Sequence, residues 1–474
     1  MSENLTPDLC VIGAGSGGLS VAAAAAAMSV PVVLVEKGEM GGDCLNYGCV
    51  PSKALIEAGK SAQAMRGSGK FGVEPAQPRI DMAQVRAHVR GVIASIAPND
   101  SEARFTSMGV KVIRAAGKFT AKDTLEAGGF TIKARRFVIA TGSSASAPPI
   151  PGLDQVRYLT NETIFDLDEL PRRLVIIGGG PIGMELSQAF RRLGAAVTVI
   201  EASRALSRED PELAAVALAA LRSNGVDIRE NAKILRIEAL ASGAQVIIQG
   251  ESGEEAIDCS HLLVAAGRTP NIHNLGLEAA GVDFSRKGIT VGKDLRTTNR
   301  RIYAIGDVTG EAAFTHAANY HAGLVLRATL FRLPVKVQPQ LIPRVTYTDP
   351  EIAVAGLTEA QARETNTKLN IYRWPLAEND RAQASHSTQG HIKIVASAKD
   401  VILGAGIAGK NAGELIALWQ LAISKGMKVK DVANLVLPYP TISEVSKRAA
   451  LTHYQKQLGN PRLGALLRFL RRFG

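Results

Sequence analysis

Cysteine and aromatic residues are scarce in this chain of 474 residues, and a long apolar run is missing. Four cysteines are too few for a scaffold held together by disulfides, and an aromatic content of 5% leaves few rings for stacking nucleic-acid bases. No segment reaches the roughly 18 uninterrupted apolar residues of a membrane-spanning helix. The N-terminal residues Met1–Asn4 lack the basic region of a secretory signal. We therefore expect a cytoplasmic protein that neither crosses a membrane nor binds nucleic acid.

The composition instead suits a globular α/β protein. The length allows about three domains of ordinary size. The hydrophobic fraction is 46%, and 46 glycines favour many tight turns between strands and helices. The net charge of +11 could attract a polyanion, but the chain contains no nucleic-acid-binding motif.

Much of the positive charge lies near the C-terminus. There the stretch Asn460–Gly474 alternates arginines with leucines at helical spacing, namely Leu463, Leu466, Leu467 and Leu470. The simpler interpretation is a C-terminal helix packed on its own domain. The alternative is an amphipathic helix that contacts a membrane surface or a partner.

The N-terminal residues have the pattern of a dinucleotide-binding turn. An apolar strand, Asp8–Ile12, leads into the sequence G-x-G-x-x-G, whose glycines are Gly13, Gly15 and Gly18. These glycines let the backbone approach a pyrophosphate at the start of the next helix. A second apolar strand, Val32–Val35, ends in Glu36, which is placed to bind the ribose hydroxyls of an adenosine.

The same pattern returns about 165 residues later. The strand Leu174–Ile177 precedes a second turn with Gly178, Gly180 and Gly183, and we expect a helix from Met184. The strand Val197–Ile200 follows and ends in Glu201. The repeat predicts two bound dinucleotides in one chain.

Glu201 favours NAD over NADP in the second site. Its carboxylate would repel a 2′-phosphate, and two like charges about 4 Å apart near a surface repel by up to ~4 kcal/mol before screening. Arg204 could partly compensate a phosphate, so NADP stays open.

Cys44 and Cys49 resemble a redox-active pair. A disulfide between them would close only four intervening residues, so it would stabilise the fold little and could cycle. The residues after Cys49 predict a helix, and a thiolate at a helix N-terminus is stabilised by free N–H groups. The alternative is two buried cysteines that happen to be close. We expect Cys10 and Cys259 to be inert. A redox pair beside two dinucleotides predicts electron transfer between nicotinamide, flavin and sulfur.

Together these motifs resemble the class I pyridine nucleotide–disulfide oxidoreductases over nearly the whole chain. The resemblance implies FAD in the first site, NAD(P) in the second, a homodimer, and two Rossmann-like domains followed by a C-terminal α+β dimerisation domain. It divides the chain into an FAD domain in two parts, an inserted NAD(P) domain and the dimerisation domain: 1–150 with 271–340, 151–270, and 341–474.

The resemblance also assigns roles to individual residues. Cys44 would be the outer thiol that attacks substrate, and Cys49 the inner thiol against the flavin. Lys53 and Glu185 match the family's ion pair near the flavin, and Lys53 lies one helical turn past Cys49. The remaining cofactor residues that it implies are Thr141 and Gly142 in a crossing strand, Asp307 at the ribityl chain, Ala317 near the flavin ring, and Gly267 at the exit from the nicotinamide domain.

The C-terminal motif departs from the best-known members of the family. In these members a histidine and a glutamate from the partner subunit serve acid–base catalysis. Here the glutamate is Glu444, but the histidine position is Tyr439. Phenol titrates ~3.5 units above imidazole, so forming the basic phenolate costs roughly 5 kcal/mol more unless the site lowers its pKa. Asp43, where many members have threonine, is a second departure that could tune the outer thiol.

The leading interpretation is an NAD-linked, FAD-containing disulfide oxidoreductase nearest in pattern to dihydrolipoamide dehydrogenase, acting on a small dithiol or disulfide or on a lipoyl domain. A reductase of small molecules or metals, like mercuric reductase, is the alternative. The paired C-terminal and N-terminal cysteines of mercuric reductases are missing, and we expect no resident metal. Soluble transhydrogenase is disfavoured because it lacks the cysteine pair. A non-enzymatic flavin-fold assembly subunit is opposed by the intact Cys44, Cys49, Lys53, Glu185 and Glu444.

Overall fold

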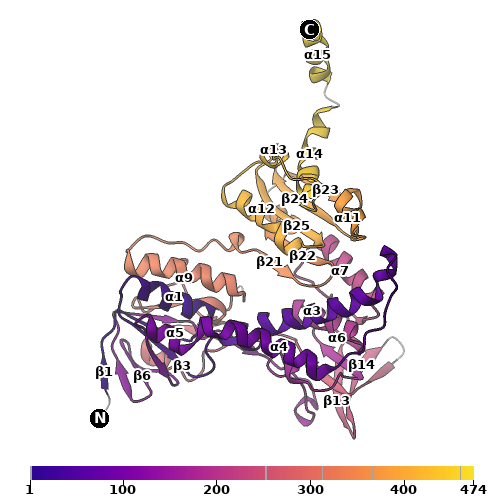
Figure 1. Ribbon diagram of the computed structural model, residues 1–474. Coiled ribbons are helices and arrows are strands. Elements are labelled where there is room, and N and C mark those ends of the chain that lie inside the picture. Colours follow the sequence, from indigo (N-terminus) through magenta and orange to yellow (C-terminus); the bar gives the residue numbers. More distant parts are fainter. Residues whose placement is uncertain (1–2, 251–252, 312, 366–367, 459–460, 474) are drawn as a thin grey trace.

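The computed structural model describes residues 3–250, 253–311, 313–365, 368–458 and 461–473. Figure 1 shows two neighbouring α/β units in the lower half, a C-terminal sheet with its helices above them, and the last helix at the far end. Among the described residues, none of the helices combines the length and the apolar character that crossing a membrane requires.

The first unit is built on a parallel sheet of five strands in the order β20-β8-β2-β3-β4. Parallel strands buried on both faces read as continuous apolar runs, as β2 and β3 do. The bounds are β2 Leu9–Ile12, β3 Val32–Glu36, β4 Lys111–Arg114, β8 Arg136–Ile139 and β20 Ile302–Ala304. Helices α1 (Ser16–Ala27) and α9 (Thr315–Leu330) pack together on this unit. The sheet therefore combines the start of the chain with a segment from beyond residue 300.

The second unit repeats this architecture with four parallel strands in the order β12-β11-β10-β16. Its bounds are β10 Arg173–Ile177, β11 Ala196–Ile200, β12 Asp227–Arg229 and β16 His261–Val264, with α6 Pro181–Leu193 and α7 Pro211–Ser223. An antiparallel sheet joins β13 (Ile234–Leu240), β14 (Gly243–Gly250) and β15 (Gly253–Cys259). Helix α6 begins at Pro181, three residues before the predicted Met184, because proline has the right φ for the first helical position.

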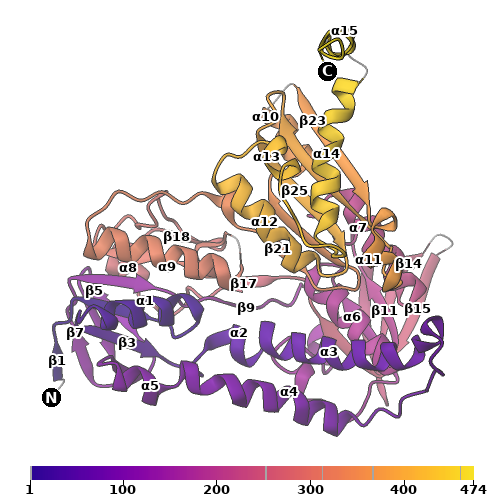
Figure 2. The same cartoon turned by 45° about the horizontal axis from the view of Figure 1, so that its top comes forward.

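Between β3 and β4 the chain forms the helices α2 (Gly42–Asn46), α3 (Cys49–Arg66), α4 (Met82–Ile96) and α5 (Glu102–Ser107). Helix α3 runs from the first unit to the second and packs against α6 (Figure 2). A small sheet beside the first unit has the order β1-β7-β6-β5, with β1 Glu3–Leu5, β5 Lys118–Ala121, β6 Thr124–Ala127 and β7 Phe130–Ile132.

Two chain segments connect the first unit with the second, and they pair with each other. Strand β9 (Ser143–Ala145) leaves the first unit, and β17 (Arg268–Pro270) returns to it, antiparallel to β9. The short elements α8 (Leu277–Ala280), β18 (Phe284–Ser285) and β19 (Gly288–Ile289) follow β17. The predicted domain boundaries at residues 150, 270 and 340 stay a prediction.

The C-terminal unit is an antiparallel sheet of five strands in the order β21-β22-β25-β24-β23. Its strands are β21 Arg344–Thr346, β22 Glu351–Gly356, β23 Leu369–Pro375, β24 His391–Ser397 and β25 Ile402–Gly409. Its helices are α10 Glu359–Thr365, α11 Asp380–Ala384, α12 Ala412–Ser424, α13 Val429–Ala433 and α14 Glu444–Leu458. With the two parallel sheets, this antiparallel unit confirms the predicted fold class.

The last helix, α15 (Pro461–Leu470), contradicts the simpler interpretation of the C-terminus. None of its described side chains is buried. In both views it lies beyond the end of α14, away from the sheets (Figures 1 and 2). The expectation that it packs on its own domain is therefore wrong. The predicted ends of this stretch, Asn460 and Gly474, lie outside the described residues.

Candidate functional site

A cavity of about 1130 Å³ lies where the three units meet. It is bounded by the turn after β2, by the starts of α2 and α3, by α6, and by α12 of the C-terminal unit. The predicted site residues that line it are Gly13, Gly15, Glu36, Cys44, Cys49, Lys53, Thr141, Gly142, Glu185 and Asp307. Of the other predicted residues, all described by the structure, none lines it: Gly18, Ala317, Gly178, Gly180, Gly183, Glu201, Gly267, Tyr439 and Glu444.

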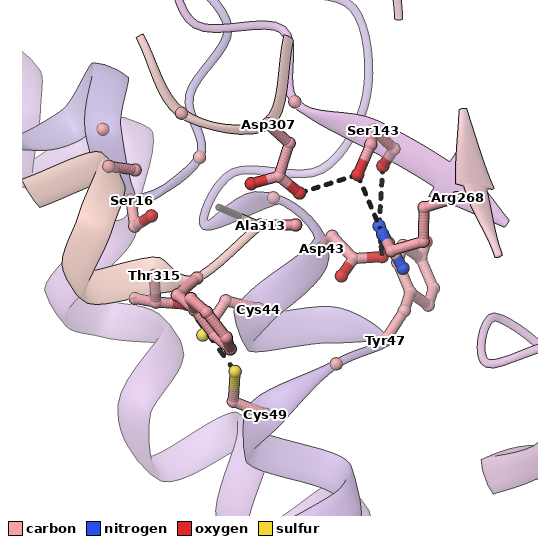
Figure 3. A pocket seen from close by; sticks show the side chains of 18 of the residues that line it. Ser16, Asp43, Cys44, Tyr47, Cys49, Ser143, Arg268, Asp307, Ala313 and Thr315 are labelled. Atoms are coloured by element: carbon pink, nitrogen blue, oxygen red, sulfur yellow. Dashed lines mark hydrogen bonds and ion pairs between the residues drawn. The ribbon is translucent and has the colours of Figure 1, made fainter. Parts of the chain in front are cut away.

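Both redox cysteines line this cavity. Cys44 is in the short helix α2, and Cys49 is the first residue of α3, as the sequence predicted. Both are reduced, and a hydrogen bond joins their sulfurs (Figure 3). Helix α3 has no side-chain cap, and its first backbone N–H, that of Cys49, donates a hydrogen bond to the Cys44 sulfur. The two sulfurs are therefore held together before any substrate binds.

The environment makes Cys49 the thiolate of the pair. The hydrogen bond with Cys44 is the main cause that lowers the pKa of Cys49 to about 6. The hydroxyl of Thr315, 3.6 Å from the sulfur, and the charge of Lys53 lower this pKa further. The same hydrogen bond and burial raise the pKa of Cys44, which keeps the shared proton.

This difference gives a titration that can be measured. We expect the alkylation rate of the reduced protein to rise with pH around a midpoint near 6, because only the thiolate reacts. Burial raises the pKa of Cys10 and raises that of Cys259 to about 11, so neither contributes. Lys53→Met should move the midpoint upward, because a cation that favours the thiolate is removed.

The matched control for this titration is Lys60→Met. Lys60 is on the same helix but forms its ion pair with Glu57, away from the cavity. A midpoint at the ordinary thiol value of about 8.5, unchanged by Lys53→Met, would show that Cys49 is not activated.

Lys53 and Glu185 form an ion pair of 2.8 Å between α3 and α6. The other carboxylate oxygen of Glu185 accepts a hydrogen bond of 2.9 Å from the backbone N–H of Tyr347, in the C-terminal unit. The Lys53 ammonium lies 4.2 Å from the centre of the Tyr347 ring. Three distant segments of the chain thus fix one cation beside the cysteines.

Asp307 belongs to a polar network that the sequence did not predict. The Ser143 hydroxyl donates to Asp307 at 2.6 Å, and Arg268 donates to this hydroxyl at 2.8 Å (Figure 3). Arg268 also forms an ion pair of 3.1 Å with Asp43, beside Cys44. Asn161 donates to the same Asp43 oxygen at 3.1 Å. The network links the cysteine loop to Asp307 through both connecting strands.

Two residues of the site that the sequence did not predict lie beside a motif. Arg268 follows directly on Gly267, and Thr315 stands in the motif that gave Ala317. Asn161 and Tyr347 stand in no motif, so only the fold brings them to the site. Ala317 itself is buried in α9, and its neighbours Thr315 and Ala318 face the cavity instead.

The two glycine turns have the same local structure. A Cβ at Gly18 would overlap the carbonyl oxygen of Gly13, and a Cβ at Gly183 would overlap that of Gly178. Each third glycine therefore permits close packing of helix against strand. Gly15 and Gly180 have open space where a Cβ would lie, and as N-caps of α1 and α6 they form no side-chain capping bond. Both helix N-termini are free to bind phosphate oxygens.

The two acidic residues also occupy equivalent places. Glu36 accepts hydrogen bonds from Ala14 N and, at 2.6 Å, from Gly38 N. Glu201 accepts them from Gly179 N at 2.7 Å and from Ser203 N at 2.9 Å. Each carboxylate therefore closes its own glycine turn as well as presenting negative charge where a ribose would lie.

Tyr439 and Glu444 lie in the C-terminal unit, away from the cavity of their own chain. The Tyr439 side chain is 69% exposed, and its hydroxyl donates to Asp380 at 2.9 Å. This hydrogen bond raises the pKa of the phenol above its ordinary value. The structure thus strengthens the expectation that Tyr439 keeps its proton.

Sequence profiles of known proteins match both parts of the chain. The profile described as pyridine nucleotide-disulphide oxidoreductase matches residues 7–322, and the profile of the dimerisation domain of the same family matches residues 342–450. The chain belongs to the pyridine nucleotide-disulphide oxidoreductase family. It is an FAD-dependent disulfide oxidoreductase with the dimerisation domain of a homodimer, and its family uses FAD and NAD(P)H.

Individual relatives carry different names. A mercuric reductase of Bacillus cereus is 37% identical over 95% of this chain and 72% of its own length. A dihydrolipoyl dehydrogenase of Geobacillus stearothermophilus is 34% identical over 95% of this chain and 96% of its own. The structure of the HOCl-induced flavoprotein disulfide reductase RclA of Escherichia coli matches with a TM-score of 0.82 at 28% identity, over 94% of this chain and 99% of that one. These names leave the substrate open.

The residues of the cavity fit FAD. The open space at Gly15 and the uncapped start of α1 suit a pyrophosphate. Glu36 lies on one side of the cavity, and Asp307 and Lys53 also line it. Uncharged side chains line the part of the cavity near α12, among them Ile416, Ala417 and Leu421.

Proposed function

We propose that this protein transfers electrons between NAD(H) and a small dithiol or disulfide, or a lipoyl group, through Cys44 and Cys49. The observation that carries the proposal is the hydrogen-bonded thiol pair with an activated Cys49, next to the Lys53–Glu185 ion pair in one cavity. When bound, FAD supplies the two-electron chemistry that links this thiol pair to the nicotinamide.

The pKa difference of the pair supports the order of the thiols. In dithiol oxidation a substrate thiolate attacks the Cys44 sulfur of the disulfide, a substrate–Cys44 bond forms, and Cys49 leaves as the thiolate. The second substrate sulfur then attacks the first, the cyclic disulfide leaves, and Cys44 regains its electron pair. Two electrons thus reach the cysteines. A thiol of lower pKa leaves faster, so attack at Cys44 with Cys49 as the leaving group is the favoured route.

Tyr439 bears on the direction of this exchange. A phenol that holds its proton can protonate a leaving substrate thiolate, but it is a poor base toward an incoming thiol. We propose that Tyr439 and Glu444 act on the cavity of the partner subunit, because they lie away from the cavity of their own chain.

The proposal is tested by NAD⁺ reduction with free dihydrolipoamide, using the FAD-saturated dimer at pH 7 to 8. Turnover near the ordinary enzyme value of about 10 per second would establish a dihydrolipoamide dehydrogenase. Turnover near zero, with the flavin still reducible by NADH, would reject the lipoyl substrate and direct the search to other disulfides.

A reductase of metal ions or other small molecules is the second candidate. The relatives named mercuric reductase and the solved Cu(II) complex of RclA favour it. The chain contains no cysteine after Cys259, so Cys44 and Cys49 would have to bind the metal substrate by themselves.

We further propose that Glu201 selects NAD over NADP. The carboxylate is held at the second glycine turn by Gly179 and Ser203, where it would repel a 2′-phosphate. We expect kcat/KM with NADH to exceed that with NADPH, and Glu201→Gln to reduce this ratio by about tenfold or more, mainly through the KM for NADPH. The matched control is Glu36→Gln at the equivalent place of the first turn, which should leave the ratio unchanged. An unchanged ratio in Glu201→Gln would assign the preference elsewhere.

A further inference from the structure

Helix α15 and the residues after it form an amphipathic surface that nothing in the described chain covers. Five large apolar side chains lie within eight residues, and each is at least half exposed: Leu466 51%, Leu467 51%, Phe469 52%, Leu470 52% and Phe473 73%. Buried aromatic and aliphatic side chains are the rule in folded proteins, and a cluster of exposed ones marks an interaction site. This surface is called the C-terminal apolar face below.

The apolar side chains share one side of the helix. At 100° per residue, Leu463, Leu466 and Leu470 fall within one narrow sector. The rings of Phe469 and Phe473 lie 5.1 Å apart, which places them together at the edge of this sector. The opposite side carries the arginines Arg468, Arg471 and Arg472.

The charge of this C-terminal region indicates what kind of partner binds the C-terminal apolar face. From Val445 to the C-terminus the sequence holds seven lysines and arginines and no aspartate or glutamate. A second copy of this chain carries a net charge of +11 and the same cationic helix, so it is a poor electrostatic match. An anionic lipid surface matches both the arginines and the apolar face.

We propose that α15 docks the enzyme on anionic membrane surfaces, with the C-terminal apolar face inserted among the lipids and the arginines at the headgroups. The helix is short and its apolar face is confined to a few turns, so it lies in the plane of the interface. Both views place α15 at one end of the chain, beyond α14 (Figures 1 and 2). Docking there leaves the cavity with the cysteines free to exchange substrate.

The test is co-sedimentation of the FAD-saturated dimer with vesicles of phosphatidylcholine and phosphatidylglycerol, compared with vesicles of phosphatidylcholine alone. We expect binding to the anionic vesicles that weakens with salt. The triple variant Arg468→Gln, Arg471→Gln, Arg472→Gln should bind on the order of 100-fold more weakly, from the contribution of each cation near an anionic surface. The double variant Leu467→Ser, Leu470→Ser keeps every charge. It should bind at least about tenfold more weakly.

The matched control removes three exposed charges far from α15. The variant Lys118→Gln, Lys233→Gln, Lys287→Gln should bind the anionic vesicles with less than a threefold loss, on the order expected from long-range charge alone. An equal loss in this control would reduce the effect to net charge and overturn the proposal. Flavin content and flavin reduction by NADH, measured on every variant, should stay unchanged, so the result is independent of the proposed reaction.

Two further outcomes would overturn the proposal. One is that the dimer binds neither kind of vesicle. The other is that Leu467→Ser, Leu470→Ser shifts the molar mass measured by light scattering from dimer to monomer. That shift would show that the C-terminal apolar face covers the second subunit instead of a membrane.

Discussion

Cys44→Ser is expected to abolish turnover of dithiols and disulfides while NADH still reduces the bound flavin. The substrate bond forms at the Cys44 sulfur, and a serine hydroxyl can form no mixed disulfide. Loss of an essential nucleophile lowers turnover by a factor on the order of 10⁶ in a well-studied protease, so only background exchange should remain. Steady-state turnover with dihydrolipoamide and anaerobic flavin reduction by NADH measure the two effects separately.

The control for this variant is Cys259→Ser. Cys259 is buried outside the cavity, and its thiol donates to the carbonyl oxygen of Ala244 at 3.3 Å, a bond that serine can keep. Its turnover should equal that of the unmodified enzyme. If Cys44→Ser retained turnover, the substrate bond would form at Cys49 or at another group, and the proposed order of the pair would be wrong.

Tyr439→His is expected to raise dihydrolipoamide oxidation at pH 7 to 8 by a factor on the order of 10². Imidazole, with a pKa near 6.5, is largely neutral there and can accept the substrate proton. The phenol cannot, because the hydrogen bond to Asp380 raises its pKa above an already high ordinary value. The sign follows from the two pKa values: a base must be unprotonated at the working pH, so its pKa must lie below that pH, as only that of histidine does.

Two companion variants separate the base from the hydroxyl. Asp380→Asn should lower the pKa of the phenol, because an amide oxygen no longer carries the negative charge that opposes the phenolate. Tyr439→Phe should slow disulfide reduction by NADH if the phenol protonates the leaving thiolate. If Tyr439→His left dihydrolipoamide oxidation unchanged, proton removal at this position would not limit the reaction.

Local patterns predicted the turns and the cysteine helix because their causes are local. The glycines Gly13 and Gly18 are required by contacts within the same turn, so their spacing alone identifies it. Helix α3 begins at Cys49 because the residues that follow have helical periodicity. The equivalence of Glu36 and Glu201 follows from the repeat in the sequence.

The remaining contacts depend on segments that only the tertiary fold brings together. Tyr347 reaches Glu185 from 162 residues away, and Asn161 reaches Asp43 from 118 residues away. No spacing rule encodes such pairs in a single sequence. The exposure of α15 could not be predicted from the sequence either. An amphipathic pattern predicts an apolar face of the helix but not which surface covers that face.

The second unit is inserted between the fourth and the last strand of the first unit, and this order affects folding during synthesis on the ribosome. The second parallel sheet is complete once β16 (His261–Val264) has emerged, whereas the first still lacks β20 (Ile302–Ala304). At about 5–20 residues per second, the first unit waits roughly 10–30 s between its fourth and its last strand. We expect ribosome-bound chains stalled after β16 and before β20 has emerged to show a protease-resistant second unit, while the first unit is still cleaved. We therefore expect FAD to bind late in synthesis, although the first glycine turn, which predicts the FAD site, is translated early.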